Sequence, residues 1–380
     1  MLTRRMMLTT AGALSLSPAM GWAAATAPVS PQAPGDAGQP ALTQDGLEAL
    51  RNVHGAPALA AAAQQRGGKT RVWATGLRMA GDPTPVTPDD QWHLGSISKS
   101  FLAMLVGRLV EQRRLSWDDR LGAALADDHP AMPPAYRDAT FLHLLSHRAG
   151  FADNLLYPVM GAFDVSKDDE RTQRRAFLDK AFALPPVGPV GATTLYSNVG
   201  YVAAAAMVEA RTGKTWQALM AREVFAPLGL RSAGFGPPGR VGALLQPVGH
   251  GPAPGRPHRL GEPHDDLPLV IGPAGRIHMT LADLVTYLAA HRDRTTLLKP
   301  ATWDVLHTPH FDGEYALGWN TWPDGSLTHD GSNLLWYAVA GFNPRTGWAA
   351  AAAANDGRPS VGNDVGQAVR EARASVAVSA

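Results

Sequence analysis

Two residues near position 96 can together activate a hydroxyl group for nucleophilic attack. The segment "HLGSISKSF" places Ser96 three residues before Lys99, where an apolar helix begins. On a helix these two side chains share a face, and the free N–H groups of a first turn favour a developing negative charge. A lysine whose pKa is lowered by burial can accept the serine proton. Because Ser-x-x-Lys fixes only two positions, a polar helix start is the alternative, and other residues must decide.

A second motif can supply the proton donor that such a site still lacks. The segment "YSN" contains Tyr196, whose phenol ionises more easily near an ammonium group and can act as a base and later as an acid. Asn198 offers an amide that can hold a substrate carbonyl. Taken alone, the tripeptide is more typical of a loop tyrosine followed by a helix cap. The sequence leaves open whether Lys99 or Tyr196 is the principal base.

A third motif, "HDGS" at 329–332, can complete the site from a strand. Gly331 would let a substrate backbone approach closely. The N–H of Ser332 could pair with the N–H of Ser96 to form an oxyanion hole. Taken alone, "HDG" is typical of a turn.

Apolar periodicity indicates the elements that must position these residues. After Ser96, apolar side chains recur with a period near 3.6, which predicts a helix in the core with its first turn at the core's edge. The apolar positions are Phe101, Leu102, Leu105, Val106, Leu109 and Val110. The other predicted elements are a helix over 42–53, strands over 56–65 and 69–80, helices and loops over 120–240, a helix that Thr280 caps, strands within 314–356 and a C-terminal helix.

The segment "GWAAAAAANDG" is ambiguous by local propensity. Alanine is the best helix former. However, Gly347 and the turn residues 355–357 bracket a run of strand length. We predict a strand, whose small side chains would let helices pack closely on the sheet.

The composition excludes several classes of function. The 380 residues are 45% apolar and 18% charged, as in ordinary globular proteins. The 34 Lys and Arg residues balance 33 Asp and Glu residues without a long run of one sign, which argues against a nucleic-acid surface. Cysteine is absent, so disulfides and thiolate chemistry are excluded. The 13 histidines lack regular ligand spacing, and we expect no metal and no cofactor.

The first residues have the pattern of an export signal. Residues 1–25 contain Arg4-Arg5, a modest apolar stretch and then small residues, similar to a twin-arginine signal. A flexible leader is expected over 26–41. Nothing later approaches the ~20 apolar residues of a membrane span. We therefore expect a periplasmic or secreted protein.

The three motifs together resemble those of the serine β-lactamase and penicillin-binding protein superfamily, in its class C-like branch. That branch has Ser-x-x-Lys, Tyr-x-Asn and Lys/His-x-Gly in this order. The segments "FLHLLSHRAGF", "YSNVGYVAAAAMVEARTGKTWQALMAREVFAPLGL", "GPAGRIHMTLADLVTYL" and "YALGWN" are also similar to family segments. The resemblance extends from about residue 45 to 357.

The resemblance implies an α/β (α+β) fold of the β-lactamase/transpeptidase type. An antiparallel sheet flanked by helices would be formed by residues 42–120 and 274–380, as one discontinuous α/β domain. A mostly helical domain would be inserted over residues 121–273. The active site would lie where the two domains meet.

The resemblance also implies a role for each motif residue. Ser96 would be the nucleophile, Lys99 the base and Tyr196 a proton shuttle. The implied substrate contacts are Asn198, His329, Gly331 and Ser332. The lactamases and DD-peptidases usually carry lysine in place of His329, which puts penicillin-like substrates in doubt. We expect the attraction of an unperturbed imidazole for a carboxylate to grow as the pH falls through about 6.5.

Two classes of function remain open. The first is an exported serine hydrolase that acts through an acyl-enzyme on a small-molecule or peptide-like substrate. It would be an esterase, a D-amino-acid peptidase or a DD-peptidase, with β-lactamase activity as a further option. The second is a non-catalytic sensor of the same fold that binds peptidoglycan or β-lactams. The presence of all three motifs favours the hydrolase, and the oligomeric state stays open.

Overall fold

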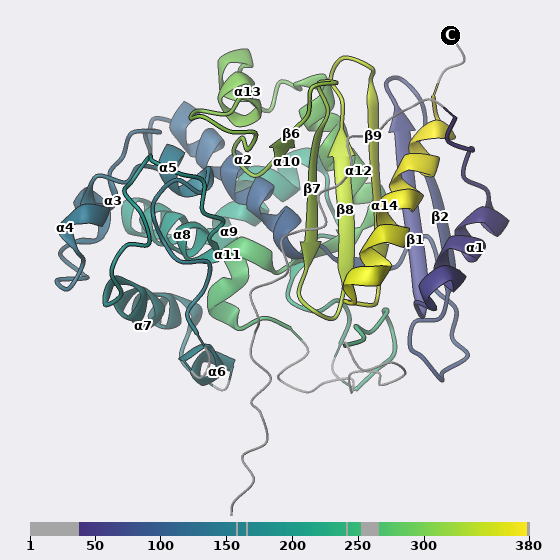
Figure 1. The fold of residues 1–380 in the computed structure, drawn as a ribbon, viewed down its shortest axis with the longest axis horizontal. Coiled ribbons are helices and arrows are strands. Elements are labelled where there is room, and N and C mark those ends of the chain that lie inside the picture. Colours follow the sequence, from purple (N-terminus) through teal and green to yellow (C-terminus); the bar gives the residue numbers. More distant parts are fainter. Residues whose placement is uncertain (1–37, 157–158, 165, 241, 252–265, 378–380) are drawn as a thin grey trace, which may run out of the picture.

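A six-stranded antiparallel sheet is the larger of the two sheets in the described part of the computed structural model (Figure 1). The structure describes residues 38–156, 159–164, 166–240, 242–251 and 266–377. The predicted signal over 1–25 and most of the predicted leader over 26–41 therefore lie outside the described residues. The strand order is β2-β1-β9-β8-β7-β6, and both ends of the chain build the sheet because β1 pairs with β9. The strands are β1 (Ala58–Gln65), β2 (Arg71–Gly76), β6 (Asn320–Thr321), β7 (Leu327–Ser332), β8 (Tyr337–Phe342) and β9 (Trp348–Ala354).

The alanine run forms strand β9, as predicted, and lies between β1 and β8. Its side chains alternate between two core clusters, with Ala351 facing one and Ala352 facing the other. Helices α1 (Gln44–His54) and α14 (Pro359–Ala374) cover one face of the sheet, and α12 (Leu281–Asp293) packs on the other (Figure 1). Since methyl groups are the only side chains on β9 after Trp348, helices can approach it closely from both faces.

Helix α2 (Ser98–Glu111) lies deep in the protein, after a 3₁₀ turn η1 (Gly95–Ile97). The predicted apolar stripe lies in the core, but burial goes further than a stripe: every residue from Ser98 to Gly107 is buried. The reason is that other elements pack around the whole helix, including α8 (Asn198–Thr212), α11 (Gly272–Gly275) and α13 (Pro300–His307). Phe101, for example, stacks on Tyr287 of α12 with ring centroids 3.6 Å apart.

The middle of the chain is mostly helical, as predicted, and lies to one side of the sheet (Figure 1). Helix α8 is central there and contacts α3, α5 and α7. It is bounded by a Ser197 N-cap, whose side chain accepts from the Gly200 N–H, and by Gly213 with φ of 69°. The helices of this region are α3 (Leu121–Leu125), α4 (Pro134–Arg137), α5 (Phe141–Leu145), α6 (Val159–Asp164), α7 (Glu170–Phe182), α8 (Asn198–Thr212), α9 (Trp216–Met220), η2 (Ala221–Phe225), α10 (Ala226–Leu228), η3 (Leu269–Ile271) and α11 (Gly272–Gly275).

A second, three-stranded sheet was not predicted. Its order is β3-β5-β4, formed by β3 (Gln91–His93), β5 (Ile277–Thr280) and β4 (Gly234–Phe235). Strands of two to four residues are too short to show a period of two. Its strand β3 lies just before η1 in the chain, and Leu94, between them, donates its N–H to the Ile277 carbonyl of β5 at 2.9 Å. It therefore anchors the segment that leads to Ser96.

Some predicted boundaries change and others hold. Strand β2 ends at Gly76, whose φ of 94° turns the chain, rather than continuing toward residue 80. Thr280 caps α12 as predicted, with its hydroxyl accepting the Asp283 N–H. Helix α13 (Pro300–His307) follows α12 in the chain and packs on α2. Within the described residues, no helix is both long and apolar enough to cross a membrane.

Candidate active site

The structure brings the first two motifs into direct contact. Ser96 lies in η1 and is partly exposed. Its Oγ accepts a hydrogen bond from Lys99 Nζ at 2.9 Å and another from the Tyr196 hydroxyl at 2.8 Å. Tyr196 is 100 residues away in the sequence, directly before α8. One hydroxyl oxygen is thus held between an amine and a phenol.

Burial controls the protonation of Lys99. The side chain is fully buried, and its Nζ donates a second hydrogen bond to the Ala274 carbonyl at 2.9 Å. Burial lowers the pKa of Lys99 to about 7, against the opposing effect of the carboxylates of Asp153 and Asp330. A substantial fraction of the amine is therefore neutral near pH 7, and its lone pair can accept the proton of the Ser96 hydroxyl.

Tyr196 keeps its proton under the same conditions. Burial raises the pKa of its phenol well above the ordinary value, while the hydrogen bond to Ser96 opposes this shift. The ring packs against His147 with centroids 4.3 Å apart, and Lys99 Nζ lies 4.7 Å from the ring centroid. His147 is held in turn by the Ser197 N–H, which donates to its Nδ1 at 3.0 Å. The tyrosine is thus a protonated group that donates a hydrogen bond to Ser96 Oγ.

Asn198 begins α8 and is paired with a residue that the motif analysis missed. Its Nδ2 donates to Asp153 Oδ1 at 3.1 Å, and its backbone N–H donates to the Asp153 carbonyl at 2.9 Å. Burial raises the pKa of Asp153. Asp153 lies 45 residues earlier in a loop, and no spacing pattern pointed to it.

The third motif lies against the turn that carries Ser96. A Cβ at Gly331 would collide with the Leu94 carbonyl oxygen and the Ser96 nitrogen, and a Cβ at Gly95 would collide with the Ser332 nitrogen. Gly95 has φ of 51°, in the left-handed region. Only two glycines allow the backbones of β7 and η1 to approach this closely. The backbone nitrogens of Ser96 and Ser332 are thereby brought to neighbouring positions.

His329 is engaged within the protein through both ring nitrogens. It is 3% exposed, its Nδ1 contacts the Asp330 carbonyl, and its Nε2 lies 3.0 Å from the Tyr315 hydroxyl. Burial, reinforced by the charge of Lys99, lowers the pKa of His329 to about 3. In a neutral ring, Nδ1–H donates to the carbonyl and Nε2 accepts from the phenol. Tyr315 belongs to the segment "YALGWN". The similarity of this segment to the family is the sequence signal that could have identified Tyr315 as a site residue.

The expectation that His329 titrates with an unperturbed pKa near 6.5 is therefore wrong. Its ring is removed from water and lies close to the Lys99 amine, and both effects oppose a positive charge. The imidazole stays neutral throughout the mildly acidic range. Any contact between His329 and a substrate in that range is made by a neutral ring.

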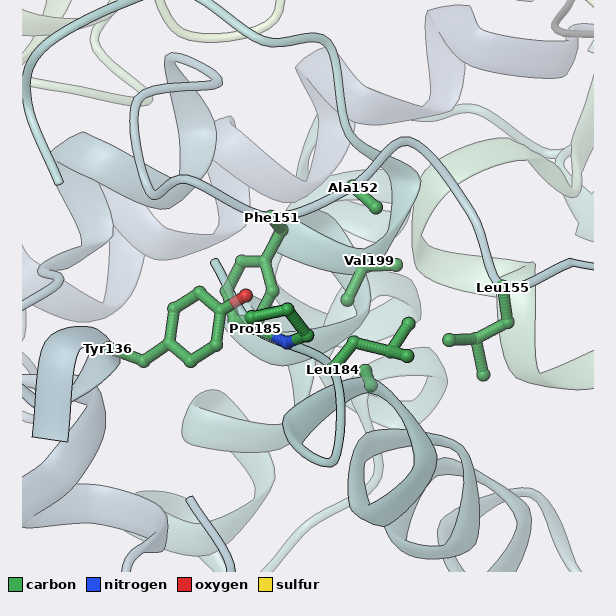
Figure 2. Close-up of a pocket in the computed structure, with 8 residues that line it drawn as sticks. Tyr136, Phe151, Ala152, Leu155, Leu184, Pro185 and Val199 are labelled. Carbon is green, nitrogen blue, oxygen red and sulfur yellow. The ribbon is translucent and has the colours of Figure 1, made fainter. Parts of the chain in front are cut away.

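The pocket in Figure 2 is separate from this site. It lies between the helices around α8 and is lined by apolar side chains, among them Tyr136 and Phe151, whose rings stack 4.2 Å apart. Its free volume is about 10 Å³, space for about one water molecule. It is too small for a substrate. Among the described residues, no group of three or more His, Asp or Glu side chains is arranged to hold a metal ion.

The fold and the site together define the class of the protein. A sheet built from both chain ends, a helical region beside it, and a serine–lysine–tyrosine cluster at the start of a buried helix are the features of a β-lactamase/transpeptidase-type serine hydrolase. A family model described as Beta-lactamase matches residues 44–374. The chain belongs to this Beta-lactamase family.

Known proteins agree with this class. Penicillin-binding protein 4 from Amycolatopsis lactamdurans is 28% identical over 339 residues, which covers 83% of this chain and 84% of that protein. A lovastatin esterase from Penicillium rubens is 26% identical over 272 residues, 64% of this chain and 66% of the esterase. The solved structure of D-amino acid amidase from Ochrobactrum anthropi SV3 has the same fold, with a TM-score of 0.68 at 21% identity over 86% of this chain and 96% of that one.

Proposed function

We propose that this serine hydrolase is exported and cleaves ester, amide or peptide-like substrates through an acyl-enzyme on Ser96. One observation carries the proposal: Ser96 Oγ is held between the Lys99 amine at 2.9 Å and the Tyr196 phenol at 2.8 Å. An amine with a pKa of about 7 can remove the hydroxyl proton, and a phenol that stays protonated can deliver one.

Acylation then follows from these positions. Ser96 Oγ attacks the substrate carbonyl carbon while its proton passes to Lys99 Nζ. The carbonyl oxygen becomes an oxyanion that accepts hydrogen bonds from the N–H groups of Ser96 and Ser332. The bond to the leaving group breaks, and the leaving group takes a proton through Tyr196, which is replenished by the Lys99 ammonium.

Deacylation repeats these roles with water. A water molecule attacks the acyl carbon and gives its proton to the Lys99 and Tyr196 pair, and the Ser96 oxygen leaves and is reprotonated. Asn198 and His329 are proposed as substrate contacts beside the reacting carbonyl. Since Asn198 Nδ2 already bonds to Asp153, its amide would be held in one orientation for the substrate.

The proposed substrates carry an uncharged group next to the neutral ring of His329. A neutral imidazole attracts a carboxylate less than an ammonium does, so we propose esters and amides ahead of penicillin-like compounds. The names of two relatives, an esterase and a penicillin-binding protein, support this range of substrates.

The proposed location is the periplasm or the exterior of the cell, on the basis of the Arg4-Arg5 signal pattern. Replacing both arginines with lysine should leave precursor in the cytoplasm.

The test is covalent labelling of the mature protein with a fluorophosphonate probe, followed by mapping of the adduct by mass spectrometry. We expect the adduct on Ser96, turnover of p-nitrophenyl esters or D-amino-acid amides, and slower turnover of nitrocefin. Ser96→Ala should lose both adduct and turnover. Ser100→Ala, at a buried serine of helix α2, which follows η1, should keep both. An adduct on another serine, or binding without turnover as in a sensor, would refute the proposal.

A further inference from the structure

A buried carboxylate, Asp266, lies between the two segments that carry the proposed oxyanion donors. Its side chain is 3% exposed. His93 Nε2 lies 3.2 Å from Asp266 Oδ2, and Asn333 Nδ2 donates to Oδ1 at 2.9 Å. Arg276 Nε lies 3.4 Å from Oδ2, and the Leu267 N–H donates to Oδ1 at 2.7 Å. One carboxylate thus contacts residues from β3, from the end of β7 and from the segment before β5.

The first of these contacts leads to Ser96. The other ring nitrogen of His93, Nδ1, accepts the N–H of Gly95 at 3.2 Å. Because Nδ1 acts as an acceptor, the ring proton lies on Nε2 and is donated to Asp266. The carboxylate therefore selects the tautomer that lets His93 hold Gly95. Gly95 is the residue whose left-handed φ of 51° directs the chain into Ser96.

The second contact leads to Ser332. Asn333 follows Ser332 directly, and its Oδ1 accepts the N–H groups of Leu335 at 3.1 Å and Trp336 at 3.0 Å. The asparagine side chain thus closes the turn between β7 and β8, while its Nδ2 is held by Asp266. The end of β7 is thereby tied to the same carboxylate as the start of η1.

Asp266 is suited to stay ionised in this position. Burial alone would raise its pKa, but His93 and Arg276 lower it below the ordinary value. An ionised carboxylate makes stronger hydrogen bonds than a neutral group. A buried charge is costly unless it is paired and hydrogen-bonded, and among the described residues four groups contact this one.

We propose that Asp266 and His93 are positioning residues that set the distance between the two oxyanion donors, the N–H groups of Ser96 and Ser332. The inference rests on the proposed function. Donors stabilise an oxyanion only when they are already aimed at the place where the charge develops. Loosening this link should therefore lower kcat more than it changes KM.

The experiment compares two esters that differ only in carbonyl oxygen or sulfur, in the parent and in Asp266→Asn. Sulfur accepts hydrogen bonds poorly, so an oxyanion hole favours the oxygen ester. We expect Asp266→Asn to lower kcat for the oxygen ester on the order of 10- to 100-fold, with KM changed by less than about threefold. The rate for the thionoester should change little, so that the oxygen-to-sulfur preference falls.

Glu209→Gln is the matched control. Glu209 is also a buried carboxylate, paired with the buried Arg174 at 2.6 Å, and it contacts neither oxyanion segment. This change should lower thermal stability and leave the oxygen-to-sulfur preference as it is in the parent. His93→Leu is the second variant, which removes the link to Gly95 and should reduce the preference as Asp266→Asn does.

The outcomes separate this inference from the proposed function. Loss of turnover in Ser96→Ala, together with an unchanged preference in folded Asp266→Asn or His93→Leu, would overturn the inference alone. Full activity in Ser96→Ala would overturn the proposed function itself. An equal loss of preference in Glu209→Gln would show a general effect of destabilisation and would also overturn the inference.

Discussion

The pKa values of Lys99 and Tyr196 decide which of these two neighbours takes the proton of the Ser96 hydroxyl. Lys99 has a pKa of about 7, so the two forms of its amine are similarly populated near neutrality. Tyr196 has a pKa well above the ordinary phenol value, so it remains protonated. Burial is the main cause of both pKa shifts, because it favours the neutral form of each group. The neutral form of Lys99 is a base, whereas the neutral form of Tyr196 is an acid. We infer that Lys99 is the principal base.

The pH dependence of kcat/KM tests this assignment. Since only the neutral amine accepts a proton, kcat/KM for an uncharged ester should rise with pH through a midpoint near 7 and fall tenfold per unit well below it. Lys99→Arg should lose activity by about 100-fold or more, because guanidinium is not deprotonated in proteins. A rate that is flat down to pH 5 would contradict the lysine base.

His329 allows a test of substrate choice at the residue scale. Its neutral ring offers no charge to a carboxylate. The amine of His329→Lys can carry one near neutral pH despite the burial, because the ordinary pKa of lysine is about four units above that of histidine. We expect this change to raise kcat/KM for nitrocefin relative to a neutral ester by about tenfold, the worth of one charge-assisted hydrogen bond. Tyr315→Phe, which removes the hydroxyl beside Nε2 without adding a charge, serves as the control and should not shift this ratio toward nitrocefin. An unmoved ratio in His329→Lys would show that this position does not set selectivity.

At the scale of elements, the site depends on the close approach of β7 to η1. That approach is allowed by Gly331 on the strand and by Gly95 in the turn, each facing the backbone of the other element. Leu94, just before the turn, is hydrogen-bonded to the small sheet, and His93 connects the Gly95 N–H to Asp266. The catalytic geometry thus depends on backbones from distant parts of the chain.

Gly331→Ala is expected to separate these two elements. Its Cβ would collide with the Leu94 carbonyl oxygen and the Ser96 nitrogen, so kcat/KM should fall by about 100-fold or more. The control is Gly366→Ala on α14, where the added Cβ meets only the tip of Arg370 at 3.6 Å. That variant should keep parental activity and gain up to about 1 kcal/mol of stability. Parental kcat/KM in Gly331→Ala would exclude a role for this close contact.

At the scale of the whole molecule, the sheet separates two apolar cores, and several histidines are buried with them. His291 and His307 form a pair, with Nδ1 of the first 2.9 Å from Nε2 of the second. Burial lowers the pKa of His307 to about 3 and that of His291 well below its ordinary value. Such groups couple folding to pH, because the unfolded chain binds protons that the folded chain excludes.

Acid should therefore destabilise the protein through His307. Above about pH 7 the ring is neutral in both states, and between about 6.5 and 3 only the unfolded state is protonated, so stability falls as the pH falls. At pH 5 the loss from this residue is about 2 kcal/mol. The test measures the free energy of unfolding in urea at pH 7.5 and at pH 5.0. Its decrease between these pH values should be about 2 kcal/mol smaller in His307→Asn than in the parent. Groups away from this pair, such as Asp153 and Asp330 with their raised pKa values, contribute equally in both proteins and cancel. His291 keeps most of its own contribution in both, because burial is the main cause of its lowered pKa. Equal drops would contradict this account.

Local features could be predicted from the sequence because they depend on neighbours along the chain. The pairing of Ser96 with Lys99 follows from helical spacing, the strand at the alanine run from its bracketing turns, and the start of α12 from Thr280 as a cap. The order of the three motifs, together with similarity along most of the chain, sufficed for the fold class. The boundaries of the helical insert at 121–273 stay a prediction.

Only the tertiary structure decided how the site works, because burial and long-range contacts are absent from local patterns. Packing removes Lys99 and His329 from water, and this desolvation sets pKa values that no spacing encodes. Asp266 lies 173 residues after His93, and only the fold brings the two side chains together. Tyr315 lies in a segment similar to the family, but its contact with His329 also depends on the fold. The residue types near Ser96 are thus a property of the sequence, whereas their protonation and alignment are properties of the folded chain.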